Sequence, residues 1–513
     1  MIAVSDKWKD VQQRFLLPES HIEINCEITE EGAQESATPS GTDEAVYSNV
    51  ESILNKDATV LYATNEHNLW GLNGTYNILP DADYGNAGYV SDIASTGSIT
   101  LSFPEIRATA VSGITITWGR DYGEYPRVFT VTAKNGNSVV AETTVTDNTE
   151  QVSAVFMKIE NYNSITITVH DWCLPNRRAR IEKVVIGHVL TLTKRDILSY
   201  SHEMRGDLLS GELPKYSIEF TLDNHDGRWN PTNPTGMEQY LSERQRLSVR
   251  YGLDLDGTIE WIDAGVFYLS EWDAPANGLE ARFVARDVFE FLSTDTSKLH
   301  DASSTQSGNL AEIVRWATNG NLPAGASVVI DASLEQSAER EFTADGTYAE
   351  MVQKCANAAC CILRYDRKGV LYVEPLNETR TDYRVAQALS YTHPEIRLAK
   401  PLKQVAVDYG GDTSYSLDVA RDGEIQSVTN NYINNEDAAE AVAKWVSGVL
   451  KNRKTVSGEF RADSRLDLYD IVLVESKYST YDEPLPVVIT SIKYDFNGSF
   501  RGSYEGRVLE VAT

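Results

Sequence analysis

The feature that most limits how this chain can fold is a two-residue alternation of apolar and polar side chains, repeated in many short segments. In residues 216–222, YSIEFTL, isoleucine, phenylalanine and leucine alternate with serine, glutamate and threonine. Successive side chains of an extended strand point to opposite faces, so one face of such a segment packs on a core and the other meets water. Similar segments, separated by Gly, Pro, Asn and Asp, recur through most of the chain. The sequence therefore predicts a mostly β, multidomain protein of the α+β class.

The residues after this first strand, Asp223–Gly227 (DNHDG), carry oxygen ligands and a glycine, as calcium loops do. A helix–loop–helix calcium loop requires glycine at its sixth position and glutamate at its twelfth. Counted from Asp223, the fifth position is Gly227 and the twelfth is Pro234. Asn, Asp and Gly are also the residues that tight turns favour. We interpret the segment as a turn, and we predict no metal site and no cofactor.

Length and composition indicate several globular domains and exclude some partners. A chain of 513 residues with 42% hydrophobic residues can form about three or four domains with cores of their own. The net charge of -29 would repel a phosphate backbone, which argues against specific nucleic-acid binding. We find no apolar run of about 18 residues and no secretory signal, so neither a membrane span nor secretion is expected. The five cysteines include an adjacent pair, which argues against a disulfide framework.

Three helices are expected among the strands. The first, in 308–320, has an apolar face made of Leu310, Ile313, Val314 and Ala317. The second follows a capping box formed by Thr347 and Glu350, and its apolar face should bury Cys355. A hairpin with a turn at 366–369 comes next. The third helix, in 434–453, is expected to point the following residues inward: Ala438, Ala441, Val442, Trp445, Val449 and Leu450.

Motifs of the common enzyme classes are missing, and we predict that the chain is not an enzyme. It has no GxSxG, no HExxH, no P-loop and no GxGxxG after a strand. Pairs of acidic residues are abundant because the chain is acidic, and glycoside hydrolysis depends on a carboxylate separation that a sequence does not give. An acidic glycoside hydrolase with an ancillary sugar-binding domain therefore stays an alternative.

Two strand ends combine aromatic residues with arginine, in TWGRDYGEYPR and HDWCLPNRRAR. Aromatic rings stack on the apolar faces of sugars, and arginine donates hydrogen bonds to sugar hydroxyls. The same tryptophans could instead fill a core, with the arginines in water. The candidate carbohydrate-contacting residues are Trp118, Arg120, Tyr122, Tyr125, Trp172, Arg177 and Arg178.

Taken in order, the segments resemble the hub proteins of phage tail tips and baseplates. The strands SITLSFP, GITITWG, FTVTAKNG and ARIEKVVIG resemble a galactose-binding-like, discoidin-type jelly roll. The segments RDILSYSHEMRGDLLSGELPKYSIEFTLDNHDGRWNP, LSVRYGL, GVFYLSEW and ARDVFEFL resemble the first β-barrel of such hubs. EIVRWATNGN and TYAEMVQKCANAACCILRYDRKGVLYVEPL are similar to their middle α/β domain, and DAAEAVAKWVSGVLKNRKTVSGEFRADSRLDLYDIVLVES to their second β-barrel.

The resemblance implies that the jelly roll is inserted in a surface loop of the first barrel, which folds tolerate well. The implied domains are the first strands of hub barrel I at 1–30, a linker at 31–62, the inserted galactose-binding-like β-sandwich at 63–187, the remainder of barrel I at 188–298, a middle α/β domain at 299–398, and a second hub β-barrel with one helix at 399–513.

The function that the resemblance implies is structural. A homotrimer with two barrels per subunit would adapt a six-fold tail tube to a three-fold tip and enclose the channel, through which DNA passes without specific binding. The implied partners are the tail tube ring or distal tail protein, a fibre, spike or tape-measure protein, and host surface polysaccharide or neighbouring baseplate proteins at the jelly roll. The protein would assemble in the host cytoplasm and end in the virion tail tip. A free carbohydrate-binding protein is the remaining alternative.

Overall fold

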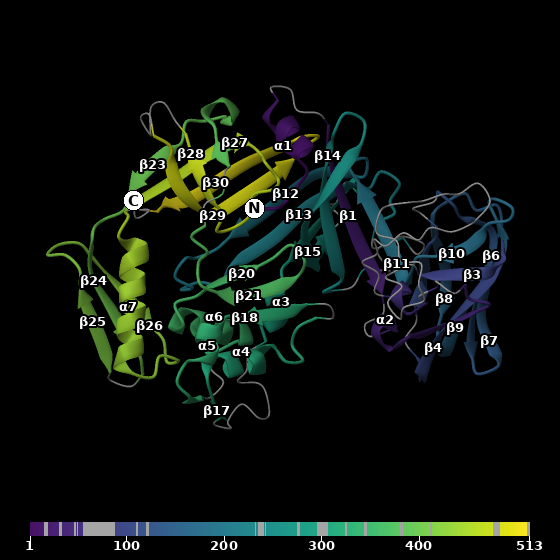
Figure 1. Cartoon of the computed structure of the whole chain (residues 1–513), viewed down its shortest axis with the longest axis horizontal. Helices are drawn as coiled ribbons and strands as arrows, with labels where there is room; N and C mark the ends of the chain where they lie inside the picture. Colours follow the sequence, from purple (N-terminus) through teal and green to yellow (C-terminus); the bar gives the residue numbers. More distant parts are fainter. Residues whose placement is uncertain are drawn as a thin grey trace. The chain divides into compact units, whose positions relative to one another are not determined.

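The computed structural model divides into two compact units, one inserted in the sequence of the other (Figure 1). Unit 1 comprises Met1–Ile24 and Leu192–Thr513, and unit 2 comprises Asn25–Thr191. Both consist mostly of strands, so the predicted mostly β, multidomain fold class is confirmed. The structure describes residues 1–14, 19–29, 33–45, 48, 50–54, 88–108, 111–119, 123–230, 232–233, 241, 243–273, 278–294, 306–323, 326–342, 346–379, 381, 383–410, 413–475 and 483–509.

Unit 2 is a β-sandwich whose two sheets share one apolar core. Its strands alternate as the sequence predicts, and Ile99 and Leu101 from one sheet belong to the same buried cluster as Ile114 and Ile116 from the other. The first sheet runs in the order β2 (Thr38–Thr42), β4 (Gly97–Arg107), β9 (Tyr162–Trp172), β6 (Pro126–Asn135) and β7 (Ser138–Val145). The other strands are β11 (Lys183–Thr193), β5 (Val111–Thr117) and β8 (Val152–Ile159), paired in that order, and the pair β10 (Arg178–Ile181) and β3 (Tyr89–Ala94). Two short helical turns, α2 (Ala33–Ser36) and η1 (Val50–Ile53), complete the described part.

The structure differs from the predicted linker at 31–62, because part of that segment belongs to the sandwich. Residues of β2 pair antiparallel with β4, from Thr38 opposite Ser102 to Thr42 opposite Ser98. Pro39 and Gly41 are tolerated within β2 because it is an edge strand. Unit 2 accordingly extends further toward the N-terminus than the predicted insertion at 63–187. Residues 55–62 of the predicted linker and 63–87 of the predicted insertion lie outside the described residues.

Unit 1 contains a long antiparallel sheet that joins segments far apart in the sequence. β12 (Ile197–Arg205) pairs with β13 (Lys215–Asp223) on one side and with β29 (Leu485–Phe496) on the other. Next to β29 follow β30 (Phe500–Val508), β27 (Lys454–Arg461) and β23 (Glu395–Leu398). Next to β13 follow β16 (Glu280–Arg286), β15 (Ile259–Asp273) and β14 (Arg246–Asp254). Shorter elements are β28 (Ile471–Val474), which pairs with β29 and with β22 (Arg384–Val385), and the helices α1 (Asp6–Gln13) and α3 (Phe289–Leu292). The chain passes between the units within β1 (Ser20–Thr29) and within β11.

The middle of unit 1 is a small α/β layer. The helix α4 (Leu310–Thr318) buries the four predicted residues, and α6 (Tyr348–Ala358) begins at the predicted capping box of Thr347 and Glu350. Cys355 is buried in the same core, as expected. The predicted turn at 366–369 is also confirmed, since it joins β20 (Ile362–Tyr365) to β21 (Val370–Glu374). The remaining elements of this layer are α5 (Ala332–Glu335), β18 (Ser327–Ile330), β17 (Gln306–Gly308) and β19 (Arg340–Phe342). A short turn elsewhere in unit 1 is η5 (Gln387–Leu389).

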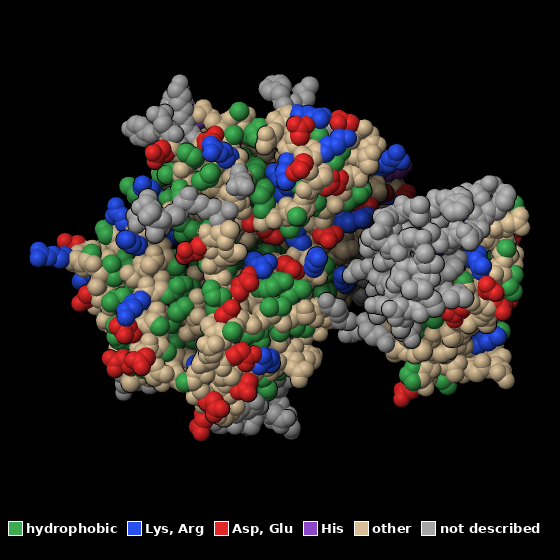
Figure 2. Space-filling model, viewed as in Figure 1, with side chains coloured by type: hydrophobic (Ala, Val, Ile, Leu, Met, Phe, Trp, Pro, Cys, Tyr) green, Lys and Arg blue, Asp and Glu red, His purple; other side chains and the backbone are tan. Residues whose placement is uncertain are grey.

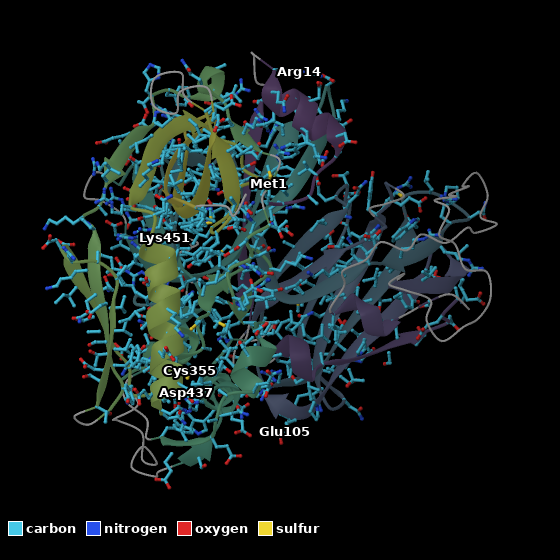
Figure 3. The ribbon with its side chains drawn as sticks, turned by 60° about the vertical axis from the view of Figure 1, so that its left-hand side comes forward. Met1, Arg14, Glu105, Cys355, Asp437 and Lys451 are labelled. Atoms are coloured by element: carbon cyan, nitrogen blue, oxygen red, sulfur yellow. The ribbon has the colours of Figure 1, made fainter. Side chains whose placement is uncertain are left out.

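The helix α7 (Glu436–Leu450) packs on a three-stranded sheet of β25 (Ser414–Asp418), β24 (Leu402–Asp408) and β26 (Glu424–Thr429). Figure 3 shows this helix between the labelled Asp437 and Lys451. Its predicted inward face is only partly right. Ala439, Val442, Ala443 and Val446 are the buried residues, whereas Ala441 is exposed and the other predicted residues apart from Val442 are half-buried. Several alanines and valines allow neighbouring stripes on this helix, and packing selects between them.

Candidate functional site

The two candidate tryptophans of the predicted carbohydrate site lie inside the sandwich. Trp118 and Trp172 are 0% and 1% exposed, and their rings meet edge to face with centroids 6.3 Å apart. The indole nitrogen of Trp118 donates to Ser153 Oγ at 2.8 Å, and that of Trp172 donates to Glu124 Oε2 at 2.8 Å. Both rings therefore fill the core and satisfy their polar atoms internally.

Candidate Arg177 is also buried, beside Glu124. Its Nε and Nη2 donate to Glu124 Oε1 at 2.8 and 2.6 Å, and Arg180 Nη1 lies 3.7 Å from Oε2 of the same carboxylate. Glu124 is 1% exposed, so a buried acid shared by Trp172 and two arginines holds this end of the sandwich together. Glu124 is not among the residues predicted from the sequence. The one local sign of its role is its position between the candidate residues Tyr122 and Tyr125.

The other candidates are half-buried or lie outside the described residues. Arg178 donates from Nη1 to the carbonyls of Ser91 and Asp92, at 2.8 and 2.9 Å, and to the Asp92 carboxylate at 3.0 Å. Tyr125 is half-buried and packs against the core. Arg120 and Tyr122 lie outside the described residues. The structure thus brings Trp118, Trp172 and Arg177 together through core contacts, and their carbohydrate-contacting role stays a prediction.

The segment Asp223–Gly227 forms the predicted turn. Asn224 is fully buried, its side-chain oxygen accepts from the Trp229 amide at 2.8 Å, and its amide group donates to the Gly278 carbonyl at 3.0 Å. Asp223 accepts from the His225 amide at 3.0 Å, and Gly227 has φ of +69°. These side chains bind the backbone of their own corner, which accounts for the Asn, Asp and Gly without a ligand.

In unit 1 the sheet that contains β12 and β29 presents one continuous polar face. Its strands alternate, so that residues such as Tyr200, Phe220 and Tyr494 are buried while their neighbours point to water. Figure 2 shows acidic and basic side chains interspersed over the visible side of this unit. Ion pairs on the polar face join Glu459 to Arg501 at 3.1 Å, Asp495 to Lys493 at 3.0 Å, Glu203 to Lys215 at 3.7 Å, Glu219 to Arg282 at 3.4 Å and Glu271 to Arg286 at 2.8 Å.

The buried side of the same sheet carries a polar network centred on Arg367, from the turn between β20 and β21. Its Nη1 donates to the carbonyls of Asp263 and Ser464 at 3.0 and 2.8 Å, and its Nη2 to that of Leu466 at 2.6 Å. Its Nε also lies 3.3 Å from the Asp467 carboxylate. One guanidinium thereby joins β15, the middle α/β layer and the segment before β28. The sequence predicts the turn but not the burial of its arginine.

Close to this arginine, His202 and two tyrosines form a buried hydrogen-bonded chain. His202 Nδ1 lies 2.8 Å from the hydroxyl of Tyr251, which lies 2.9 Å from the hydroxyl of Tyr200. Burial, together with the positive charge of Arg367, lowers the pKa of His202 to about 3. The imidazole is therefore neutral at physiological pH.

A polar cleft of about 450 Å³ opens beside Arg367, lined among others by Asp263, Arg364, Glu374 and Asp470. Arg364 Nε donates to Glu374 Oε1 at 2.9 Å, and its guanidinium lies 4.1 Å from the centre of the Tyr372 ring. Charges of both signs are thus paired within the wall. In the part of the chain that the structure describes, no three His, Cys, Asp or Glu side chains are grouped so as to hold a metal ion.

Comparisons with known proteins give structural neighbours only. No family model matches the chain. No curated protein matches it either. Two similar solved structures are the prophage MuSo2 tail protein from Shewanella oneidensis (12% identity, 62% of this chain and 95% of that chain, TM-score 0.43) and the tail protein from Neisseria meningitidis MC58 (11%, 62% and 93%, 0.43). A third is a prophage tail protein from Listeria monocytogenes EGD-e (11%, 62% and 91%, 0.40). Because these identities and TM-scores are low, we base no conclusion on them. Among the described helices, none is long and apolar enough to cross a membrane.

Proposed function

We propose that this chain is a structural, non-enzymatic hub protein of a phage or phage-derived tail tip and that it works as a homotrimer. The observation that carries the proposal is the pairing of β12 with β29, in register from Tyr200 opposite Phe496 to Arg205 opposite Ser491. This pairing joins an earlier and a later group of strands edge to edge in one sheet. Three copies would supply six such groups, as an adaptor between a six-fold tube and a three-fold tip requires.

The polar face of this sheet suits the wall of a DNA channel. Five of its basic side chains lie within ion-pair distance of acidic neighbours, so a phosphate would have to compete with a carboxylate for each of them. The chain as a whole carries a net charge of -29, which opposes adhesion of DNA. In this proposal DNA passes along the face without specific binding.

The proposed place of the protein is the tail tip of the virion, after assembly in the host cytoplasm. Its partners there would be the tail tube ring or distal tail protein on one side and a fibre, spike or tape-measure protein on the other.

Native mass spectrometry of the full-length chain over a dilution series tests the proposal. We expect a trimer that dissociates only on dilution, and class averages from negative-stain electron microscopy with three-fold symmetry and a central hole. A strict monomer at every concentration, both alone and with an assembled tail tube added, would contradict it.

A further inference from the structure

The N-terminal segment 5–14, which contains α1, contacts two parts of the long sheet of unit 1. We call strands β12 to β16 the early group and strands β23, β27, β29 and β30 the late group. Among the described strands the two groups pair only where β12 meets β29, and we call this pairing the seam. Figure 1 shows α1 close to the ends of β14 and β27. These two strands are not neighbours in the sheet, so the segment joins strands that the ladder leaves apart.

On the late group the segment binds the end of β27. Gln12 is 6% exposed, and its Nε2 donates to the Ala462 carbonyl at 2.8 Å. The guanidinium of Arg461 donates to the carbonyls of Gln12 and Arg14, to the latter at 2.6 Å. The last carbonyls of the segment are therefore bound by a side chain of the late group.

On the early group the ion pairs of the segment are about half exposed. Lys7 Nζ and Arg14 Nη1 lie 3.5 and 2.9 Å from the carboxylate of Asp256, in the turn between β14 and β15. Lys7 also donates to the Leu255 carbonyl at 2.6 Å. The segment precedes β1, which pairs with β14. Chain connectivity thus keeps the segment near the early group even when the exposed ion pairs break.

The helix α1 depends on these contacts because it is short. It has eight residues, and isolated helices shorter than about 12–15 residues are marginal in water. Its N-terminus is capped within the segment, since Ser5 Oγ accepts from the Trp8 amide at 3.1 Å. Its last turn contains no basic residue, although a cation is favourable at a helix C-terminus. Arg461 supplies this cation from the late group, so docking completes the helix.

We propose that residues 5–14 form a strap that folds only when it is docked on the late group and that then holds the two strand groups together. Trp8 and Val11 are 1% and 0% exposed in the docked strap. Undocking would expose both side chains and remove the Arg461 contacts at the same time, so helix formation and docking are coupled. The strap is a conformational device of a single chain, and it is independent of the tail-tip proposal.

The test is hydrogen–deuterium exchange mass spectrometry of the full-length chain, which follows α1 and the seam separately. The first variant is Arg461→Met, which removes the donors to the end of α1. Its matched control is Arg501→Met, because Arg501 lies directly opposite Arg461 in the ladder of β27 and β30 and pairs with Glu459 instead. The second variant is Trp8→Ala, which changes no strand residue. It decides the test if Arg461→Met disturbs β27 itself.

We expect Arg461→Met and Trp8→Ala to raise the exchange rates of the α1 amides at least about tenfold. The rates at the seam should rise about two- to fivefold, whereas those of α4 and α6 should stay within about twofold. Arg501→Met should leave α1 and the seam within about twofold of the parent.

Three results would overturn the strap. Protection of α1 that survives both variants would show that the helix does not need docking. Loss of α1 protection with an unchanged seam would show that the segment does not hold the strand groups together. An equal rise at the seam, α4 and α6 would show a general loss of stability instead of a strap. A trimer in native mass spectrometry with any of these results would leave the tail-tip proposal standing.

Discussion

The two units bury charged groups in different ways. In unit 2, Glu124 is held by Trp172, Arg177 and Arg180, all from one end of the same sandwich. In unit 1, Arg367 binds the backbone of β15 and of residues 464–466, about one hundred positions away on either side. The first cluster fixes a local corner, whereas the second joins segments that no local sequence pattern brings together. Substitution of Glu124 should therefore destabilise unit 2 locally, whereas substitution of Arg367 should destabilise unit 1 as a whole.

The largest effect is expected from Arg367→Met. Methionine keeps much of the side-chain volume, but it removes the Arg367 donors from three carbonyls and the cation beside the Asp467 carboxylate. The Leu466 carbonyl would keep the Tyr494 hydroxyl, and Asp467 Oδ1 would keep the Leu468 amide. Breaking a buried charged network from one side typically costs about 3–5 kcal/mol. We expect a loss of that size in the free energy of unfolding of unit 1. Urea unfolding followed by hydrogen–deuterium exchange mass spectrometry, which follows each unit separately, measures it.

Lys368→Met is the matched control, because Lys368 is exposed in the same turn. Its effect should stay within about 0.5 kcal/mol. Equal effects of the two substitutions, or a loss of protection confined to the turn at 366–369, would show that Arg367 does not join the segments of unit 1.

A smaller and more local effect is expected from Glu124→Gln. Glutamine keeps the size of the side chain and one acceptor oxygen, but it removes the charge that faces Arg177 and Arg180. Hydrogen bonds to charged groups contribute about 1.5–3 kcal/mol, and we expect a loss in that range for unit 2 alone. The same exchange measurement gives the result. Destabilisation of both units by this substitution would remove the distinction between a local and a long-range cluster.

A feature of this structure is predictable from the sequence when the residues that form it lie close together in the chain. The face of α4 was predicted because Leu310, Ile313 and Val314 are large and have one helical register, whereas the alanines of α7 allow several. The turn at 366–369 was predicted from its own residues. The burial of Arg367 was not, because backbone carbonyls accept its hydrogen bonds and any residue type supplies those. The tryptophans of unit 2 could be interpreted as a site or as a core, because their acceptors, Ser153 for Trp118 and Glu124 for Trp172, lie about 35 and 48 positions away in the sequence.

The free energy of unfolding of unit 1 should depend on pH through the buried His202. Burial lowers the pKa of His202 to about 3, below the ordinary value of 6.5 that the unfolded chain would have. The unfolded state therefore binds the proton first, and unit 1 should lose stability as pH falls from about 6.5 toward 3, by at most about 1.4 kcal/mol per pH unit. His202→Phe should remove this slope. The measurement is the midpoint of urea unfolding of unit 1 at several pH values, for the parent and the variant.

A second buried group titrates in the opposite direction, so the difference between parent and variant is the quantity to compare. Burial raises the pKa of Asp287 to about 7, although the amides of Tyr216 and Phe289 donate to its carboxylate. The stability that a protonated Asp287 contributes is present below the ordinary pKa of 3.8 and is lost as pH rises through about 7. If His202→Phe left the acid slope of unit 1 unchanged, the slope would belong to other groups.

The smallest effect is expected on the polar face of unit 1, from Arg501→Gln. Arg501 and Glu459 lie 3.1 Å apart, but their side chains are 62% and 50% exposed. Water screens such a pair, and holding two long side chains in one geometry costs entropy, so the loss of stability should be below about 0.5 kcal/mol.

The effect of Arg501→Gln on DNA retention should be more informative than its effect on folding, because the substitution frees a carboxylate on the proposed channel wall and makes that wall more acidic. Retention of duplex DNA on the immobilised chain at about 50 mM salt should be as low as for the parent. The opposite substitution, Glu459→Gln, releases Arg501 and should raise retention at low salt only. Equal retention of DNA by both variants and the parent would show that this face does not contact DNA. The stability predictions for Arg367 and Glu124 would be unaffected.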